Sequence, residues 1–175
     1  MRCLLDKVTA RLAVQGLLKL GEDQALTNEE LFAFDLFLRA SRSPHRLFIV
    51  PPTASVLSQF AEHARYSPII HLFLARVEVI QPARYFKRWA RRLRDLGFTR
   101  EDAAVLALST FGTDSAATIL GIEIVATDDQ AMTNNWMMRQ TAVQIRLSAM
   151  QRHLPAPYQY ARLPQVLRPE QIVIK

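Results

Sequence analysis

Residues 123–129 read Glu123-Ile124-Val125-Ala126-Thr127-Asp128-Asp129, an apolar run that ends in two carboxylates. A short apolar run of this kind predicts a buried strand, here over residues 122–127. A second run, Cys3-Leu4-Leu5, leads in the same way to Asp6. In open parallel α/β sheets, ligands bind at the carboxyl ends of the strands. Carboxylates that follow two separate strands therefore predict a divalent-metal site at that edge.

Elsewhere in the chain, short apolar runs alternate with segments of helical periodicity. This alternation predicts a three-layer α/β/α fold around a central parallel sheet of four to five strands. The other strands are expected over residues 46–50 and 76–80, with a last edge strand over residues 172–174. Helices are expected over residues 8–20, 28–40, 53–64, 69–74, 83–96, 100–111 and 131–150.

Polar side chains mark the starts of several helices. Residues 27–30 and 99–102 each read as a capping box, in which a threonine and an acidic side chain bind free backbone amides. Thr53 or Ser55 is expected to cap the helix that follows the second strand.

Length and composition indicate one globular domain. The chain has 175 residues, 50% hydrophobic and 22% charged, enough for one sizeable core. Its core is expected over about residues 3–135, followed by a C-terminal helix and tail over residues 136–175. No apolar run is long enough for a membrane span, and no secretory signal is recognisable. The single cysteine, Cys3, favours a small buried side chain and a reducing, cytoplasmic location.

The chain is basic, with a formal net charge of +6 and a pI near 10.0. Such a charge favours an anionic partner, and nucleic acid is the first candidate. The expected helix over residues 83–96 concentrates the cations that would bind it: Arg84, Lys87, Arg88, Arg91 and Arg92. These cations have two interpretations. They form either a solvated helix face or a surface that binds the phosphate backbone of nucleic acid without regard to sequence.

Three acidic positions carry the candidate chemistry. Asp6 and Asp129 follow strands, Asp102 lies in the first turn of a helix, and Asp128 is adjacent to Asp129. Carboxylate oxygens are the preferred ligands of Mg²⁺ and Mn²⁺, which polarise phosphate and activate water. The alternative for each position is structural, because an aspartate also caps or begins a helix.

The ordered set of Leu4-Leu5-Asp6, residues 101–104 and residues 125–129 resembles the PIN domain family. The resemblance covers about residues 3–135. It implies an α/β/α fold with a parallel sheet and a metal-dependent ribonuclease that hydrolyses single-stranded RNA with Mg²⁺ or Mn²⁺. Many members are toxins of bacterial toxin–antitoxin pairs, so an antitoxin or a second copy is an implied partner.

Matched to the family's motifs, Asp6 is the first metal ligand and Asp102 the aspartate of the late helix. In the family's Thr-x-Asp motif, Thr127 and Asp129 match the named residues, and Asp128 falls on the variable position. Thr127 would orient a carboxylate or contact phosphate. Asn134 or Asn135 would add a neutral oxygen ligand or a phosphate contact.

Three features depart from the family pattern. Lys7 stands where the family commonly has a polar residue after the first aspartate, and the segment between Asp102 and Asp129 is longer than usual. Gln59 stands where the family has a glutamate, on the helix after the second strand. Glu62 lies about one helical turn further on and is the candidate substitute. Gln59 and Lys7 favour a second hypothesis: a degenerate PIN-like domain that binds nucleic acid or a protein partner without catalysis.

Other motifs weigh less. A phosphotransferase of the haloacid-dehalogenase type would use Asp6 as nucleophile, but Val8 stands where its second aspartate belongs. The four histidines lack metal-ligand spacing, and no phosphate-binding glycine loop is present. Residues 136–138, Trp-Met-Met, are interpreted as core or as an oligomer contact.

Overall fold

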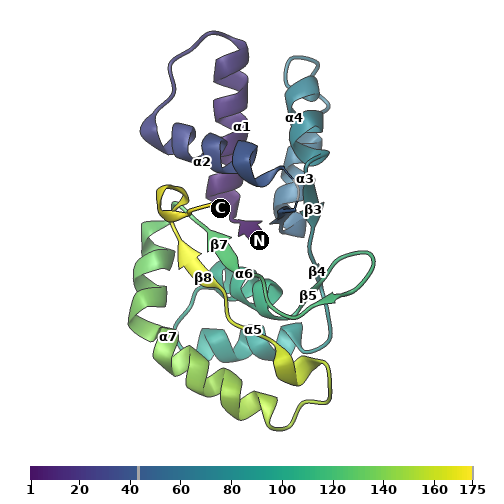
Figure 1. Cartoon of the computed structure of the whole chain (residues 1–175), viewed down its shortest axis with the longest axis vertical. Helices are drawn as coiled ribbons and strands as arrows, with labels where there is room; N and C mark the ends of the chain where they lie inside the picture. The colour runs from purple at the N-terminus through teal and green to yellow at the C-terminus, as the bar shows by residue number, and fades with distance from the viewer. Residues whose placement is uncertain (43, 175) are drawn as a thin grey trace.

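A parallel sheet of five strands forms the centre of the molecule in the computed structural model, which describes residues 1–42 and 44–174 (Figure 1). The strand order is β3-β2-β1-β7-β8, and every neighbouring pair is parallel. The strands are β1 (Arg2–Leu5), β2 (Arg46–Ile49), β3 (Val77–Val79), β7 (Ile124–Ala126) and β8 (Gln165–Leu167). The predicted α/β fold with a central parallel sheet is confirmed.

Alternate residues of a strand point to opposite sides of the sheet, so both faces carry apolar side chains. Helices cover both faces. Cys3 and Leu5 belong to one buried cluster, and Leu4 belongs to the other. The first cluster contains side chains of α1 (Lys7–Gly21), α2 (Asn28–Ala40), α3 (Pro51–Phe60) and α4 (Ser67–Leu74). The second contains side chains of α5 (Phe86–Asp95), α6 (Arg100–Thr110) and α7 (Gln130–Gln151). None of the helices in the described ranges is long and apolar enough to cross a membrane.

The last strand lies elsewhere than predicted. Residues 172–174 are in no strand, and β8 at Gln165–Leu167 pairs with β7 instead. The prediction was wrong because the apolar side chain of Ile172 fills the core beside α2 without being part of a strand; it is 2% exposed. Pro164 and Pro169 flank β8. Because proline interrupts a strand pattern, the sequence did not indicate a strand here. Pro169 opens a short 3₁₀ helix, η2 (Pro169–Gln171).

Local signals placed two helix starts correctly and one wrongly. The capping box at Thr27 and Glu30 is present, and Thr99 accepts a hydrogen bond from the Asp102 amide. Neither Thr53 nor Ser55 caps α3, which begins at Pro51 after Val50 without a side-chain cap. Proline suits the first helical position because its missing N–H would have no partner there.

The basic helix α5 begins later than predicted, at Phe86 in place of residue 83. Just before it, β4 (Gln81–Pro82) pairs with β5 (Gly112–Thr113), and the Ala83 amide donates to the backbone oxygen of Phe111 at 3.1 Å. Tyr85 then adopts a left-handed conformation, with φ of 73°, before the helix starts. Pairing with a distant segment therefore decided this boundary.

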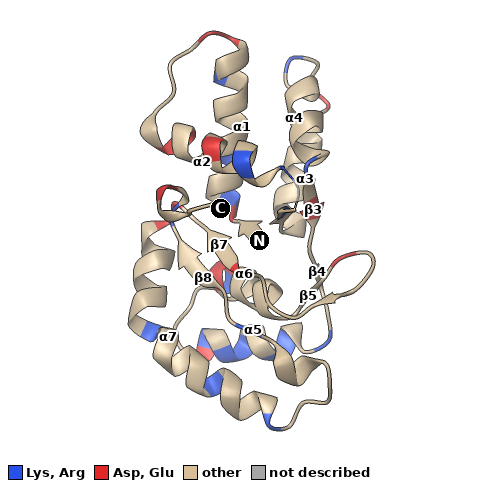
Figure 2. Cartoon of the chain, in the orientation of Figure 1, with Lys and Arg blue, Asp and Glu red and all other residues tan. Residues whose placement is uncertain are grey.

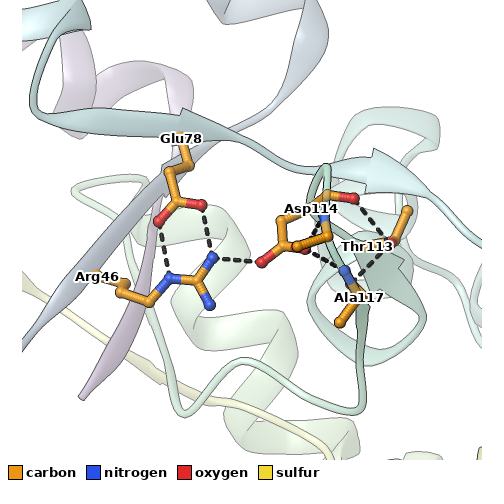
Figure 3. Close-up of polar contacts among 6 residues, drawn as sticks. Arg46, Glu78, Thr113, Asp114 and Ala117 are labelled. Atoms are coloured by element: carbon orange, nitrogen blue, oxygen red, sulfur yellow. Dashed lines mark hydrogen bonds and ion pairs between the residues drawn. The ribbon is translucent and has the colours of Figure 1, made fainter.

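A small antiparallel sheet, β4-β5-β6, is tied to the central sheet by Arg46. Strand β6 (Thr118–Ile119) completes the hairpin that begins at β5. Arg46 donates two hydrogen bonds to Glu78 of β3, at 2.7 and 2.6 Å, and another to Asp114 in the hairpin (Figure 3). Asp114 in turn accepts from the amides of residues 116 and 117, so one guanidinium fixes the turn against the central sheet.

The order of the strands places a reversal of winding at the carboxyl edge of the sheet. The chain proceeds from β1 outward to β2 and β3, and then returns to the other side of β1 to form β7 and β8. Ligands of open α/β sheets bind where the direction of winding reverses, outside the carboxyl ends of the strands. In this molecule that point lies between β1 and β7, which Asp6 and residues 127–129 follow directly.

Candidate functional site

Asp6 and Thr127 meet at this edge because β1 and β7 are paired, with Leu5 opposite Ala126. The Thr127 hydroxyl donates a hydrogen bond to Oδ2 of Asp6, and both residues are buried. Oδ1 of Asp6 accepts from the amide of Val8 and thereby caps α1. The Asp6 carboxylate is thus held in one orientation from two sides.

The two carboxylates that follow Thr127 have different partners. Asp129 caps α7, since its Oδ1 accepts from the amides of Ala131 at 2.8 Å and Met132 at 3.1 Å. Its own amide donates to the Thr127 hydroxyl at 3.0 Å. Asp128 accepts instead from the Thr9 hydroxyl of α1 at 3.2 Å. Thr127 therefore connects Asp6 with Asp129, whereas Asp128 belongs to the contact between β7 and α1.

Electrostatics connects Asp102 to the same edge. Burial raises the pKa of Asp6, the Thr127 hydroxyl opposes this shift, and the charge of Asp129 adds to it. Burial also raises the pKa of Asp102, and repulsion from Asp129 again contributes. Asp129 therefore acts on both Asp6 and Asp102. Negative charge accumulates at this edge, and a bound cation would relieve it.

The donor chemistry suits a hard cation, but a complete cage is not formed. Within residues 1–42 and 44–174, no three His, Cys, Asp or Glu side chains are grouped closely enough to hold a metal ion. Mg²⁺ usually keeps several waters and uses only one or two carboxylates. The site therefore fits a hydrated ion at Asp6 and Asp129 better than direct ligation by all three aspartates.

The other predicted ligands lie apart from this group. Gln59, in the last turn of α3, and Glu62, just beyond it, are both exposed. Asn134 is exposed in α7, and Asn135 donates to the backbone oxygen of Gly97 at 3.3 Å. In the part of the chain that the structure describes, no side-chain hydrogen bond joins Gln59, Glu62 or Asn134 to the aspartates.

The cations predicted to bind nucleic acid lie on the outer face of α5 and just before it. Arg84, Lys87, Arg88 and Arg91 are exposed, Arg92 is half-buried, and Trp89 is fully buried on the inner side. None of these five cations forms an ion pair with a described acidic residue. Figure 2 shows further basic residues along α7, which contains Arg139 and Arg146. Burial lowers the pKa of Arg92, and the charges of Arg88, Arg146 and Arg91 add to this.

Sequence reasoning did not predict several contacts at the edge. Lys7 and Glu101 form an exposed ion pair of 2.9 Å that joins α1 to α6 beside Asp6 and Asp102. Thr9 follows Asp6 by three residues, a helical spacing that places it on the same side of α1. Arg168 and Glu170 both act on the charge of Asp128. Arg168 and Glu170 were not predicted at this edge because they follow β8, and the last strand was predicted elsewhere.

The apolar residues 136–138 divide between core and surface. Trp136 is 5% exposed and packs near Phe98, whereas Met137 and Met138 are 70% and 76% exposed. Trp136 is therefore a core residue, and only the two methionines offer a surface for contact.

Comparisons with models of protein families, with curated proteins and with solved structures find no match for this chain.

Proposed function

We propose that this protein is a metal-dependent ribonuclease of PIN-like architecture that hydrolyses single-stranded RNA. The observation that carries the proposal is the placement of Asp6 and Asp129 at the carboxyl ends of β1 and β7, where the winding of the sheet reverses. The raised pKa of Asp6 and of Asp102, both influenced by Asp129, supports a shared site.

In this proposal, Asp6, Asp102 and Asp129 hold Mg²⁺ or Mn²⁺, some of them through water, and Asp128 lies beside them. The bound ion supplies positive charge that polarises a phosphate and lowers the pKa of water. Thr127 fixes the orientation of the Asp6 carboxylate. The cations of α5 hold the RNA backbone, and α6, which carries Asp102, follows α5 directly in the chain.

The test is cleavage of labelled single-stranded RNA with Mn²⁺, with Asp6→Asn as the variant. Asp35→Asn is the matched control, because Asp35 is a partly exposed residue of α2 and pairs with Arg39. Substitution of a residue that only supports a metal's ligands typically costs about 10–100-fold in activity. We expect Asp6→Asn, which removes a proposed ligand, to lose more activity than that. Activity without added metal, or an unaffected Asp6→Asn variant, would contradict the proposal.

A second function is favoured by two observations. Gln59 replaces the expected glutamate, and the described residues contain no ready group of three metal ligands. Both fit a degenerate PIN-like domain that binds nucleic acid or a protein partner without cutting. Calorimetric titration distinguishes the two functions. If the protein binds RNA but shows no Mn²⁺ binding that the Asp6→Asn substitution abolishes, the second function is supported.

Partners follow from the same proposal. A toxin of a toxin–antitoxin pair would bind an antitoxin, and the exposed Met137 and Met138 favour contact with a protein, including a second copy.

A further inference from the structure

Helices α5 and α7 lie side by side (Figure 1) and are joined by hydrogen bonds. Arg139 of α7 donates to the backbone oxygen of Leu96 at 2.5 Å, and Asn135 donates to that of Gly97 at 3.3 Å, both just beyond the end of α5. Buried side chains of both helices belong to one apolar cluster. The outer faces of the two helices therefore keep fixed positions relative to each other.

The two helices share a basic surface. This α5–α7 surface consists of Arg88, Arg91 and Arg92 of α5 and Arg146 of α7. Arg92 is half-buried, and the other three are exposed. Burial lowers the pKa of Arg92, and the charges of Arg88, Arg146 and Arg91 add to this. The cation of α7 therefore lies within electrostatic reach of those of α5.

Acidic side chains hardly oppose the charge of the α5–α7 surface. None of its arginines forms an ion pair with a described acidic residue. Asp95 is the only acidic residue of α5, and the sequence has no Asp or Glu between Asp129 and Glu170, a range that includes all of α7. Positive charge that the protein itself does not neutralise favours a polyanion as partner.

The arginines suit a chain of phosphates. Each guanidinium is a planar fork that binds phosphate through two hydrogen bonds. On α5 the arginines recur about once per helical turn of about 5.4 Å, which suits a polymer with repeated charges better than a single small anion. A membrane surface fits α5 less well, because an interfacial helix inserts exposed apolar side chains into the lipid. Within the described residues 86–95, no large apolar side chain is exposed.

The α5–α7 surface is far from the candidate metal site. Asp129 begins α7, and Arg146 follows it after a helical rise of about 25 Å, at 1.5 Å per residue. Arg139 lies between them on α7, about 15 Å from Asp129. A stacked strand advances about 3.4 Å per nucleotide, so about seven nucleotides cover the whole distance. A strand that contacts both sites must therefore extend well past the bond at the aspartates.

We propose that the α5–α7 surface binds the phosphates of single-stranded RNA at a distance of about seven nucleotides from the bond at Asp6 and Asp129, so that the protein selects long strands over short oligonucleotides. This inference rests on the proposed nuclease. It adds Arg146 to the RNA-binding residues and gives the substrate a minimum length. Binding at the α5–α7 surface requires neither metal nor cleavage, so it can be measured separately.

Fluorescence anisotropy with labelled dodecauridylate, in EDTA to prevent cleavage, measures this binding. Arg88→Gln and Arg146→Gln each remove one phosphate contact, the first from α5 and the second from α7. The slope of log K against log salt should become shallower by about 0.7 for each variant and by about 1.4 for the double variant. Arg76→Gln removes an exposed arginine outside the surface and should leave the slope unchanged.

Two results of this measurement overturn the proposal. One is an equal slope for Arg146→Gln and Arg76→Gln. The other is equally tight binding of polyglutamate, or of vesicles of phosphatidylglycerol, which would assign the surface to an acidic protein or to a membrane.

Cleavage with Mn²⁺ separates this inference from the nuclease itself. We expect kcat/KM for dodecauridylate to exceed that for triuridylate at least about tenfold, because the trinucleotide is too short to contact both sites. Equal cleavage of the two lengths overturns the length selection and leaves the nuclease standing. Binding with the expected slopes but without cleavage of either length overturns the nuclease and leaves RNA binding at the α5–α7 surface standing.

Discussion

Asp6 combines a structural and a candidate chemical task in one side chain. Oδ1 caps α1, and Oδ2 accepts from Thr127 across the β1–β7 pair. At 7% exposure its charge is costly, which is why burial raises its pKa. A carboxylate kept in such a place at a cost in stability is typical of a functional site.

We predict that Asp6→Asn stabilises the metal-free protein at pH 7. Asparagine can keep the helix cap but removes the buried charge. Because the folded-state pKa of Asp6 is raised, the free energy of unfolding falls as pH rises from its unfolded pKa through its folded pKa. At pH 7 we expect the substitution to raise the free energy of unfolding by ~1 kcal/mol, which in a domain of this size raises the melting temperature by about 2–4 °C. Below about pH 4, where Asp6 is protonated in both states, we expect no change in melting temperature.

Thermal unfolding with and without Mn²⁺ checks this prediction. Mn²⁺ should raise the melting temperature of the natural protein and leave Asp6→Asn unchanged. A variant that melts at a lower temperature at pH 7 would show that the bond from Thr127 outweighs the cost of burying the charge.

At the scale of the element, α7 depends on the residue that precedes it. Asp129 supplies two hydrogen bonds to the first turn, while Trp136, Val143 and Leu147 bury the inner face of the helix. The same carboxylate repels Asp6 and Asp102. Its cap and its charge can be separated by substitution.

We predict that Asp129→Ala lowers stability by about 1 kcal/mol, because the first turn of α7 loses its cap. Asp129→Asn keeps a capping oxygen and removes the charge, so it should be close to neutral in stability. Both variants should lose Mn²⁺ binding if the carboxylate is a ligand. Urea unfolding measures the first effect and calorimetry the second; equal stability loss in both variants would contradict the capping role.

At the scale of the whole molecule, Arg46 joins three segments that are distant in sequence. It binds Glu78 on β3 and Asp114 in the hairpin, and its guanidinium lies 5.0 Å from the centre of the Phe48 ring. The hydrogen bond from Arg46 lowers the pKa of Asp114 to about 2, and the amides of residues 116 and 117 add to this. The hairpin is thus held to the central sheet by charge as well as by the β4–β5 pairing.

We predict that Arg46→Met lowers the free energy of unfolding by about 1 kcal/mol at pH 7, a modest value because solvent screens the partly exposed guanidinium. Since the folded-state pKa of Asp114 is depressed, its contribution is present above its unfolded pKa and is lost as pH falls towards about 2. The difference between Arg46→Met and the natural protein should therefore shrink between about pH 4 and pH 2. Urea unfolding across this range, with Arg76→Met as control, measures it; a pH-independent difference would contradict the ion-pair account.

The sequence by itself determined the elements whose signals are local. Strands β1, β2, β3 and β7, the capping box at Thr27 and Glu30, and the positions of Asp6 and Asp129 at strand ends follow from periodicity and from hydrogen bonds within a few residues. Only the tertiary structure decided the rest. Pairing between distant segments set β8 and the start of α5, and joined Thr127 to Asp6. The alignment of α5 with α7 has the same origin, because contacts between distant segments depend on how the whole chain packs and leave no periodic trace in the sequence.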